Sequence, residues 1–365
     1  MKPSEIIPSF FLVGVRDFSF SKELESFLKE FPVPGLILFN SPFDKPSNIW
    51  SDRESALEGI YEFIKKASQN INFFAVDQEG GRVRRLRAPF IHLPSAQKIR
   101  EAFDNTGKMD KIEELYCLAA KQMALTNIHL NFAPVCDFRT KDSSNVVGDR
   151  SYGENLNEVF PFVEAFCRVF ENEQVHTTLK HFPGHGPTRF DSHERIAVVF
   201  KNKRELFKED REIFLKAAAN ASAILTAHIA FEDDPETIFS LDQKLLKEFK
   251  KNMPAHLVWI TDDLLSMKAV SEIKPWLKAF DCEYDFISLC GDLENSMRAI
   301  EDTIRYTETS VKDFTQELAI EKRAKRSTHL FREKKELPKF KDWRSKILEL
   351  EALGNDCLEA LQIKF

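Results

Sequence analysis

The chain has 365 residues with 43% hydrophobic side chains, so it is long enough for one large α/β barrel or two ordinary domains with a sizeable core. Its formal net charge is −6, and its 52 Lys and Arg residues are spread along the sequence. Because they form no continuous basic stripe, nucleic acid is not expected as a partner.

The N-terminal stretch MKPSEIIPSFFLVGV has one lysine and a short apolar run that Pro8 interrupts, with no small-residue cleavage site after it. Because it does not look like a signal peptide, we expect a cytoplasmic protein. No window of 18 uncharged apolar residues is present, so we expect no membrane-spanning helix. The six cysteines form no C-x-x-C pair, and we expect them to be reduced thiols in the core.

Eight short apolar runs bounded by turn residues are predicted as strands. They cover residues 10–15, 35–39, 71–76, 129–135, 175–182, 222–229, 256–261 and 284–290. Segments with helical spacing lie between most of them, including residues 55–67, 111–125, 156–170 and 202–220. Strands that alternate with helices pair in parallel, and eight such units close a barrel. The sequence therefore predicts the α/β class, as a (β/α)8 TIM barrel.

A doubly wound open sheet would also explain the alternation of strands and helices. That fold binds its ligand beside a glycine-rich first turn, and no G-x-G-x-x-G follows an early strand here. After residue 290 the pattern is wholly helical, through residues 301–331 and 341–365. We therefore expect a barrel over residues 1–300 and a helical C-terminal extension, residues 301–365, packed on it.

Charged and imidazole side chains collect where the predicted strands end. Asp77 follows the run FFAV, and Glu79, Gly80 and Gly81 come directly after it. Paired glycines allow a positive φ or a close backbone approach, so the acidic residue can point inward while the chain turns sharply. An ordinary turn with an Asp cap on the next helix would give the same pattern. Barrel enzymes assemble their sites from the loops at this end of the strands, which favours the functional interpretation.

The stretch KHFPGHGPTRFDSHE, residues 180–194, contains three histidines in a segment that its prolines and glycines keep out of helix and sheet. Lys180 and His181 leave an apolar strand directly, where a lysine is costly unless it meets a ligand or an acidic partner. Asp191 stands two residues before His193 and can orient and charge its imidazole, which can then donate and accept a proton near neutral pH.

Zinc is the competing interpretation of this histidine-rich stretch, and three unrelated core or surface histidines are another. The usual H-E-x-x-H or Cys/His pairs of zinc sites are absent from the sequence. We therefore expect neither a catalytic metal nor a cofactor.

Asp262 and Asp263 end the strand HLVWIT. Because neighbouring side chains of a strand point to opposite sides, one of these carboxylates faces the mouth of the barrel. A carboxylate placed opposite a proton donor can trap an oxocarbenium-like sugar as a covalent intermediate. The other carboxylate can simply cap the next helix.

Five motifs on five strand ends resemble those of bacterial family 3 glycoside hydrolases of the β-N-acetylglucosaminidase type. They are AVDQEGGRVRRL, NFAPVCDF, VVGDRSYG, KHFPGHGPTRFDSHE and TDDLLSMKA, within roughly residues 8–290. The resemblance implies a single (β/α)8 barrel that removes terminal non-reducing β-linked N-acetylglucosamine with retention of configuration. It also implies an N-acetylglucosamine-containing glycan or, as in peptidoglycan recycling, a cytoplasmic muropeptide as the substrate, with no membrane partner.

The resemblance assigns roles to individual residues. Those that would bind the sugar are Asp77, Arg85, Arg150, Lys180 and His181. His193, polarised by Asp191, would be the mobile acid/base. The family pattern places Leu two and Met four residues after the nucleophile, so Leu265 and Met267 select Asp263. Aligning Thr261 with the family's Thr or Ser selects Asp262 instead and requires one inserted residue, so we expect Asp263 to be the nucleophile.

The sequence departs from the family pattern near the acid/base residues. It has Gly186-Pro187-Thr188 in place of Gly-Asp-Thr, and Ile196-Ala197 in place of Leu-Pro. Pro187 can stiffen one end of this loop, which bears on turnover more than on sugar recognition. Three alternatives therefore stay open: a β-glucosidase, an enzyme that uses phosphate as the acceptor, and a catalytically silent sugar-binding barrel.

Overall fold

The computed structural model describes residues 2–16, 18–39, 53–140, 146–186, 188, 196–266, 274–311, 314–329 and 336–365. Within them, eight strands form one parallel sheet in the order β11-β9-β7-β6-β3-β2-β1-β12. In chain order these strands are β1 (Phe11–Val15), β2 (Gly35–Leu38), β3 (Phe73–Val76), β6 (Ile128–Asn131), β7 (His176–Phe182), β9 (Ala223–Thr226), β11 (Val258–Thr261) and β12 (Ile287–Leu289). Each lies on one of the eight predicted runs.

The two end strands of this sheet, β11 and β12, meet and nearly close the barrel. A parallel bridge pairs Ile260 with Phe286. Main-chain hydrogen bonds continue on from it, from Thr261 N to Phe286 O at 3.1 Å and from Leu264 N to Ser288 O at 3.1 Å. The prediction of a (β/α)8 barrel is therefore confirmed.

The interior of the barrel is filled by side chains. Because neighbouring residues of a strand point to opposite faces, alternate residues form an inner cluster separate from the larger core under the helices. The buried members of the inner cluster are Leu12, Ile37, Phe73, Ala75, Leu130, Phe132, Ala223, Leu225, Val258, Ile260, Phe286 and Cys290. A packed interior leaves no central pore, so a ligand must bind at one end of the barrel.

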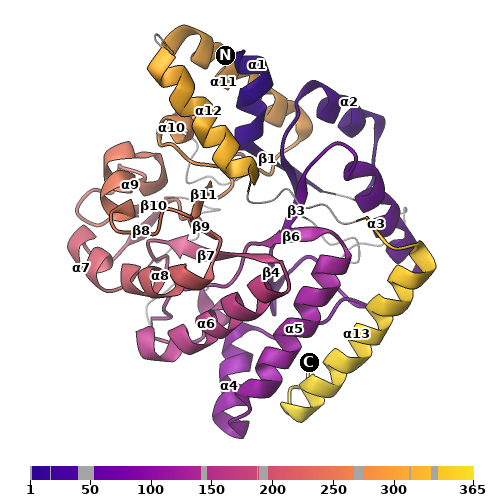
Figure 1. Cartoon of the computed structure of the whole chain (residues 1–365). Helices are drawn as coiled ribbons and strands as arrows, with labels where there is room; N and C mark the ends of the chain where they lie inside the picture. The colour runs from indigo at the N-terminus through magenta and orange to yellow at the C-terminus, as the bar shows by residue number, and fades with distance from the viewer. Residues whose placement is uncertain are drawn as a thin grey trace.

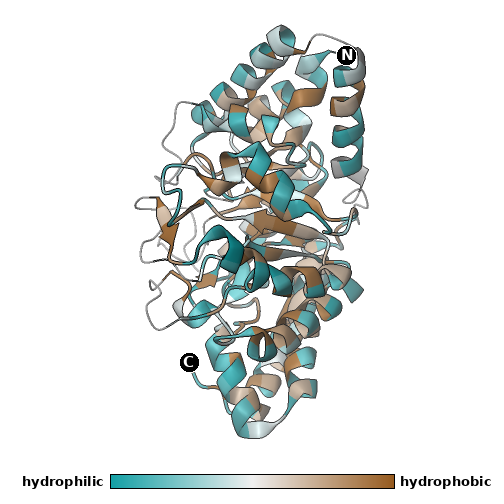
Figure 2. Ribbon diagram, turned by 90° about the vertical axis from the view of Figure 1, so that its left-hand side faces the viewer, coloured by the Kyte–Doolittle hydropathy of each residue, from teal (hydrophilic) through white to brown (hydrophobic). Residues whose placement is uncertain are grey.

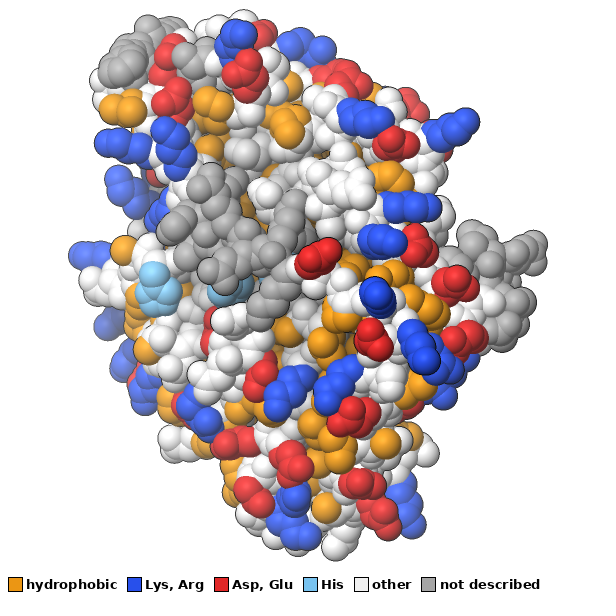
Figure 3. All heavy atoms as spheres, turned by 45° about the vertical axis from the view of Figure 1, so that its right-hand side comes forward, with side chains coloured by type: hydrophobic (Ala, Val, Ile, Leu, Met, Phe, Trp, Pro, Cys, Tyr) orange, Lys and Arg blue, Asp and Glu red, His pale blue; other side chains and the backbone are white. Residues whose placement is uncertain are grey.

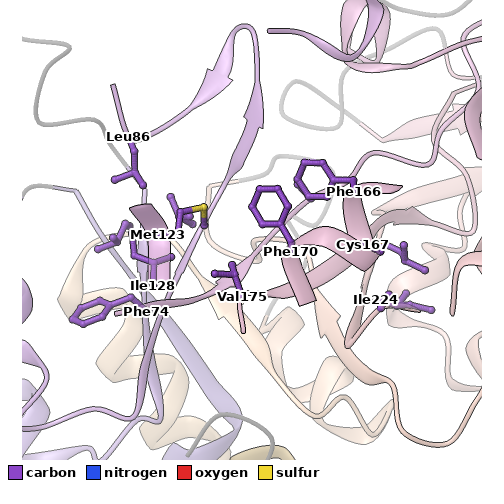
Figure 4. Packing of buried hydrophobic residues seen from close by; sticks show 14 of the residues in the cluster. Phe74, Leu86, Met123, Ile128, Phe166, Cys167, Phe170, Val175 and Ile224 are labelled. Carbon is purple, nitrogen blue, oxygen red and sulfur yellow. The ribbon is translucent and has the colours of Figure 1, made fainter. Parts of the chain in front are cut away.

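Helices surround the strands and present their polar faces outward (Figures 1 and 2). They are α1 (Pro3–Ile6), α2 (Lys22–Glu30), α3 (Arg53–Ala67), α4 (Ala96–Thr106), α5 (Met109–Leu125), α6 (Leu156–Asn172), α7 (Lys203–Lys208), α8 (Arg211–Ala217), α9 (Gln243–Lys250), α10 (Pro275–Asp281) and α11 (Leu293–Ser310). Phe166 and Phe170 of α6 stack with their ring centroids 4.1 Å apart. They belong to the outer core together with Met123 of α5 and Phe74 of β3 (Figure 4).

Short elements complete the framework. They are the strands β4 (Gln78–Gly80), β5 (Val83–Arg84), β8 (Ala197–Val199) and β10 (Ile229–Phe231) and the 3-10 turns η1 (Ile7–Phe10), η2 (Gly148–Arg150), η3 (Ala218–Asn220) and η4 (Phe239–Leu241). β4 pairs with β5, and β8 pairs with β10. The single helix predicted over residues 202–220 is divided into α7, α8 and η3, with Glu209 and Asp210 between α7 and α8.

Two further helices follow α11, and α13 (Phe340–Ala360) lies beside α5 (Figure 1). Trp343 of α13 is 1% exposed and packs on Tyr61 of α3, with 5.5 Å between ring centroids. Gln122 of α5 donates through Nε2 to Ile347 O at 2.9 Å. The boundary expected between residues 300 and 301 falls within α11, and we keep the division into a barrel and a helical extension as a proposal.

α12 (Phe314–His329) contacts the strands at the end of the barrel where β11 and β12 begin. Arg326 donates through Nη2 to Asp285 Oδ2 at 2.6 Å and to Leu257 O at 3.2 Å. Asp285 Oδ2 also accepts from Trp259 N at 2.8 Å. One side chain of α12 thus binds both strands of the pair that closes the barrel.

None of the described helices combines the length and the apolar composition needed to cross a bilayer. On the face drawn in Figure 3, acidic and basic side chains are interspersed. All six cysteines are free thiols, as predicted, and all but the half-buried Cys117 are buried.

Candidate active site

A cavity of about 190 Å³ opens at the carboxyl ends of the parallel strands. It is smaller than the roughly 300–1,000 Å³ of typical pockets for drug-sized ligands, which suits a small ligand. Part of its lining is apolar and includes Ile37, Phe39, Phe132 and Leu225. The rest contains all five predicted sugar-binding residues and both candidate nucleophiles: Asp77, Arg85, Arg150, Lys180, His181, Asp262 and Asp263.

Lys180 is the buried cation at the centre of this group, with a side chain that is 3% exposed. Its Nζ lies 2.8 Å from Asp77 Oδ1 and 2.5 Å from Glu79 Oε1. Burial acts to lower the pKa of Lys180, but the two carboxylates outweigh it and raise the pKa above its usual value. The acidic partner that the sequence required for this lysine is therefore present, and the ammonium stays charged at neutral pH.

Glu79 links Lys180 to Arg150 and is the residue whose importance the sequence did not reveal. Arg150 Nε and Nη2 lie 2.8 and 2.7 Å from the two carboxylate oxygens of Glu79, a bidentate pair. Burial alone would raise the pKa of Glu79, but Arg150 and Lys180 hold it well below its ordinary value. Two buried cations in one site need at least one buried carboxylate, and this requirement is the signal that could have found Glu79.

His181 is held in one tautomer by two neighbours. Its Nδ1 lies 2.6 Å from Asp137 Oδ2, and its Nε2 lies 3.0 Å from Arg150 Nη2. Because a guanidinium can only donate, Nε2 accepts, and Nδ1 carries the proton that Asp137 receives. Asp137, which the sequence analysis did not single out, also accepts from His185 N at 2.6 Å. Burial would raise the pKa of Asp137, but the two imidazoles lower it below its ordinary value.

Arg85 reaches the cavity from the hairpin that follows Asp77. Gly80 and Gly81 both have positive φ, 117° and 55°, which confirms the sharp turn expected there. Gln78 fixes the end of the hairpin by accepting from Arg85 N at 2.9 Å. The Arg85 guanidinium lies 3.7 Å from Asp77 Oδ2 and 5.0 Å from the centroid of the Phe39 ring.

Asp263 is fully engaged by hydrogen-bond donors of the protein. Its Oδ1 accepts from Leu265 N at 3.0 Å and from Cys290 N at 2.7 Å. Its Oδ2 accepts from Ser266 N at 2.9 Å and from the Ser266 hydroxyl. The residue is 5% exposed. This carboxylate therefore acts as a cap that ties the loop after β11 to the end of β12.

Asp262 has a different environment. It is half-buried, lines the cavity, and accepts through Oδ1 from Asp263 N at 2.9 Å. The neighbouring His228 is buried, and its Nε2 lies 3.2 Å from Asp263 O. Its Nδ1 lies 2.5 Å from Ser240 Oγ, so His228 is itself held in place and fixes the backbone of Asp263. Of the two carboxylates, Asp262 is the more accessible from the cavity.

Asp191 and His193, which the sequence assigns to proton transfer, lie outside the described residues, as do Pro187 and Met267. The segment that contains Asp191 and His193 follows Gly186 and Thr188 in the sequence and precedes β8. In the part of the chain that the structure describes, no group of three or more His, Cys, Asp or Glu side chains has an arrangement that could hold a metal ion.

The buried carboxylates make stability depend on pH. Because the pKa of Glu79 is lower in the folded state than its ordinary 4.5, its contribution is present above about pH 4.5 and is lost as the pH falls. Replacing Glu79 with Gln breaks a buried ion-pair network, so we expect the free energy of unfolding at pH 7 to fall by about 3–5 kcal/mol.

The difference in the free energy of unfolding between the Glu79→Gln variant and the wild type is expected to narrow between pH 5 and pH 3 in urea unfolding. Over this range the unfolded state of the wild type takes up a proton at Glu79 that the folded state does not bind, and this favours unfolding. The exposed Glu25, which pairs with Lys29 at 2.6 Å, provides the control. Glu25→Gln should change stability by less than about 0.5 kcal/mol. A pH-independent difference for Glu79→Gln would contradict the assignment.

The model of the glycosyl hydrolase family 3 N-terminal domain matches residues 8–281 of this chain. The chain belongs to glycosyl hydrolase family 3. Its family 3 relatives include the beta-hexosaminidase of Actinobacillus pleuropneumoniae serotype 5b (strain L20), which is 30% identical over 355 residues, 95% of this chain and 98% of the relative.

Two solved structures have the same fold. A fungal multi-domain β-N-acetylglucosaminidase superposes with a TM-score of 0.80 at 22% identity, covering 97% of this chain and 43% of its own. Native NagZ from Neisseria gonorrhoeae superposes with a TM-score of 0.73 at 19% identity, covering 95% and 98%. The chain thus spans less than half of the fungal protein and nearly all of the bacterial one.

Proposed function

We propose that this family 3 chain is a retaining β-N-acetylhexosaminidase that releases terminal non-reducing β-linked N-acetylglucosamine. The observation that carries the proposal is the meeting, in one small cavity, of a charged sugar-binding network with an accessible carboxylate at the end of β11. Membership of the family and the beta-hexosaminidase relatives support the reaction and the substrate class.

The polar half of the cavity suits a ring that carries several hydroxyl groups. Lys180 and Arg150 donate and Asp77 accepts. The ion pairs of Lys180 with Asp77 and of Arg150 with Glu79 hold these side chains in place before the ligand arrives. The Nε2 lone pair of His181 faces Arg150, so this histidine serves as a fixed polar contact and not as a proton donor. The apolar side chains of the lining suit the carbon face of the ring.

For the nucleophile, the hydrogen bonds favour Asp262. This is the residue selected when Thr261 is aligned with the family's Thr or Ser. The four donors that Asp263 accepts would have to be given up, at least in part, before either of its oxygens could form a bond to carbon. We therefore assign nucleophilic attack to Asp262. Asp263, which the alignment of Met267 with the family's Met selects, instead positions the loop after β11.

The reaction then proceeds in two displacements. The Asp262 carboxylate attacks the anomeric carbon while protonated His193, polarised by Asp191, donates its proton to the departing glycosidic oxygen. In the second step the neutral imidazole removes a proton from water, which attacks the anomeric carbon and releases the Asp262 carboxylate. Two inversions give net retention. By the motif resemblance, we further propose muropeptides in the cytoplasm as the physiological substrate and site of action.

Hydrolysis of 4-nitrophenyl N-acetyl-β-glucosaminide, beside the matching β-glucoside, tests this function. We expect the N-acetylglucosaminide to be turned over faster, without added phosphate and unchanged by EDTA. Preference for the glucoside would indicate a β-glucosidase, and a sugar phosphate formed only with added phosphate would indicate a phosphorylase. Saturable sugar binding without product would indicate a silent barrel, and each of these results would overturn the proposal.

A further inference from the structure

We propose that Asp210 and Lys201 are positioning residues for the proton-transfer step, because together they hold both ends of the segment that contains Asp191 and His193. The inference rests on the proposed function, in which that segment supplies the acid/base. Neither residue touches the substrate cavity, so their effect on the reaction would be transmitted through the two ends of the segment.

The first end of the segment lies against the Asp210 side chain. Gly184 has a φ of +139°, and a Cβ built on it would lie 2.8 Å from Asp210 Cβ, so only a glycine allows this approach. Two residues past Gly186, Thr188 donates through Oγ1 to His185 O at 3.0 Å. This end of the segment is thus folded back on itself directly beside Asp210.

The second end of the segment is tied to the same carboxylate. After β8, Lys201 places Nζ 2.6 Å from Asp210 Oδ2 and 3.1 Å from Glu209 Oε2. An antiparallel bridge between Thr188 and Val199 joins the two ends to each other. Asp210 is therefore the side chain at which the chain entering the segment and the chain leaving it converge.

The position of Asp210 explains why the expected helix over residues 202–220 is interrupted. Asp210 lies between α7 and α8 and is only 3% exposed, whereas its neighbour Glu209 is 58% exposed at the side chain. An uninterrupted amphipathic helix would not be expected to bury an aspartate, since burial of a charge is unfavourable without a partner. The break between α7 and α8 delivers the carboxylate to Lys201.

Burial affects the two partners differently: Asp210 and Glu209 outweigh burial at Lys201 and raise its pKa, whereas burial dominates at Asp210. Burial raises the pKa of Asp210 to about 6, against the effect of Lys201, with Asp137 and Glu209 adding to the increase. Since the folded state binds this proton more tightly than the unfolded state, stability is highest below about pH 3.8 for this group and declines as the pH rises through about 6.

Four variants and a reference separate positioning from folding. Lys201→Met and Asp210→Asn remove one charge each, Lys201→Arg keeps the charge, and Lys216→Met is the matched control. Lys216 lies on α8, pairs with Glu212 at 3.2 Å and is 49% exposed. The reference is His193→Ala. For each, kcat/KM is measured on 4-nitrophenyl N-acetyl-β-glucosaminide and on an alkyl N-acetyl-β-glucosaminide, whose leaving group needs protonation.

We expect Lys201→Met and Asp210→Asn to lose at least about tenfold more activity on the alkyl substrate than on the aryl substrate, in the direction of His193→Ala. Lys201→Arg and Lys216→Met should keep the wild-type ratio. The thermal midpoint of Asp210→Asn above pH 6 should be equal to or higher than that of the wild type. Equal losses on both substrates, or losses that follow the thermal midpoint, overturn the inference.

The same experiment separates this inference from the proposed function. If the wild type does not hydrolyse the aryl substrate, or if His193→Ala shows no dependence on the leaving group, the proposed function fails. If His193→Ala shows that dependence and the Lys201 and Asp210 variants do not, the proposed function stands and the positioning role is wrong.

Discussion

Asp262→Asn should reduce hydrolysis of 4-nitrophenyl N-acetyl-β-glucosaminide by on the order of 10⁴-fold or more, because an amide cannot form the covalent intermediate. Binding of free N-acetylglucosamine, measured by calorimetry, should persist, since Lys180, Arg150 and the other sugar contacts are unchanged. The half-buried position of Asp262 also predicts little loss of folding stability.

Asp263→Asn is the matched control, one residue away. Its amide nitrogen would face backbone N–H groups that now donate to a carboxylate, so we expect a loss of about 1–3 kcal/mol in the free energy of unfolding. Activity should fall less than in Asp262→Asn. The opposite result, with Asp263→Asn inactive and Asp262→Asn active, would make Asp263 the nucleophile, as the register of Met267 indicates.

His193→Ala should show a loss that depends on the leaving group. On an alkyl N-acetyl-β-glucosaminide, whose departing oxygen needs a proton, we expect a decrease of about 10²–10⁴-fold in kcat/KM. On the 4-nitrophenyl substrate the decrease should be smaller, because a nitrophenolate leaves without protonation. Steady-state kinetics on both substrates measure the difference.

The control for His193→Ala is His176→Ala, a histidine at the start of β7, at the opposite end of that strand from Lys180 and His181. It should change kcat/KM on the two substrates by the same factor. Equal losses for His193→Ala on the two substrates would remove His193 from the acid role and direct attention to another proton donor of the cavity.

Most of the fold could be predicted because its signals are local. Each barrel strand is a short apolar run bounded by turn residues, and the alternation with helices decides the parallel pairing. The strand ends also bring the predicted sugar-binding residues into one cavity, since parallel strands bring all their carboxyl ends to the same side.

The sequence could not predict which charged side chains pair with one another when the two residues are far apart in the chain. Glu79 and Arg150 are 71 positions apart, and Asp137 and His181 are 44 apart, so no periodicity relates them. The interruption at Asp210 was missed for the same reason, because helical spacing continues across it while its ion pair with Lys201 depends on tertiary contact. The choice between Asp262 and Asp263 needs the hydrogen bonds of the loop after β11.

The contacts of Arg326 connect the helix α12 to the start of β11, the strand that leads into Asp262 and Asp263, and to the start of β12. Arg326 donates to Leu257 and Asp285 at one end of the seam between β11 and β12. At the other end of the seam, Asp263 accepts from Cys290 N and so links the same two strands. If β11 slid along β12, the carboxylate of Asp262, the proposed nucleophile, would move relative to the rest of the cavity. A chain truncated after Ser310 would therefore keep every residue proposed to react. It would still lose the Arg326 hydrogen bonds that hold β11 and β12 in register.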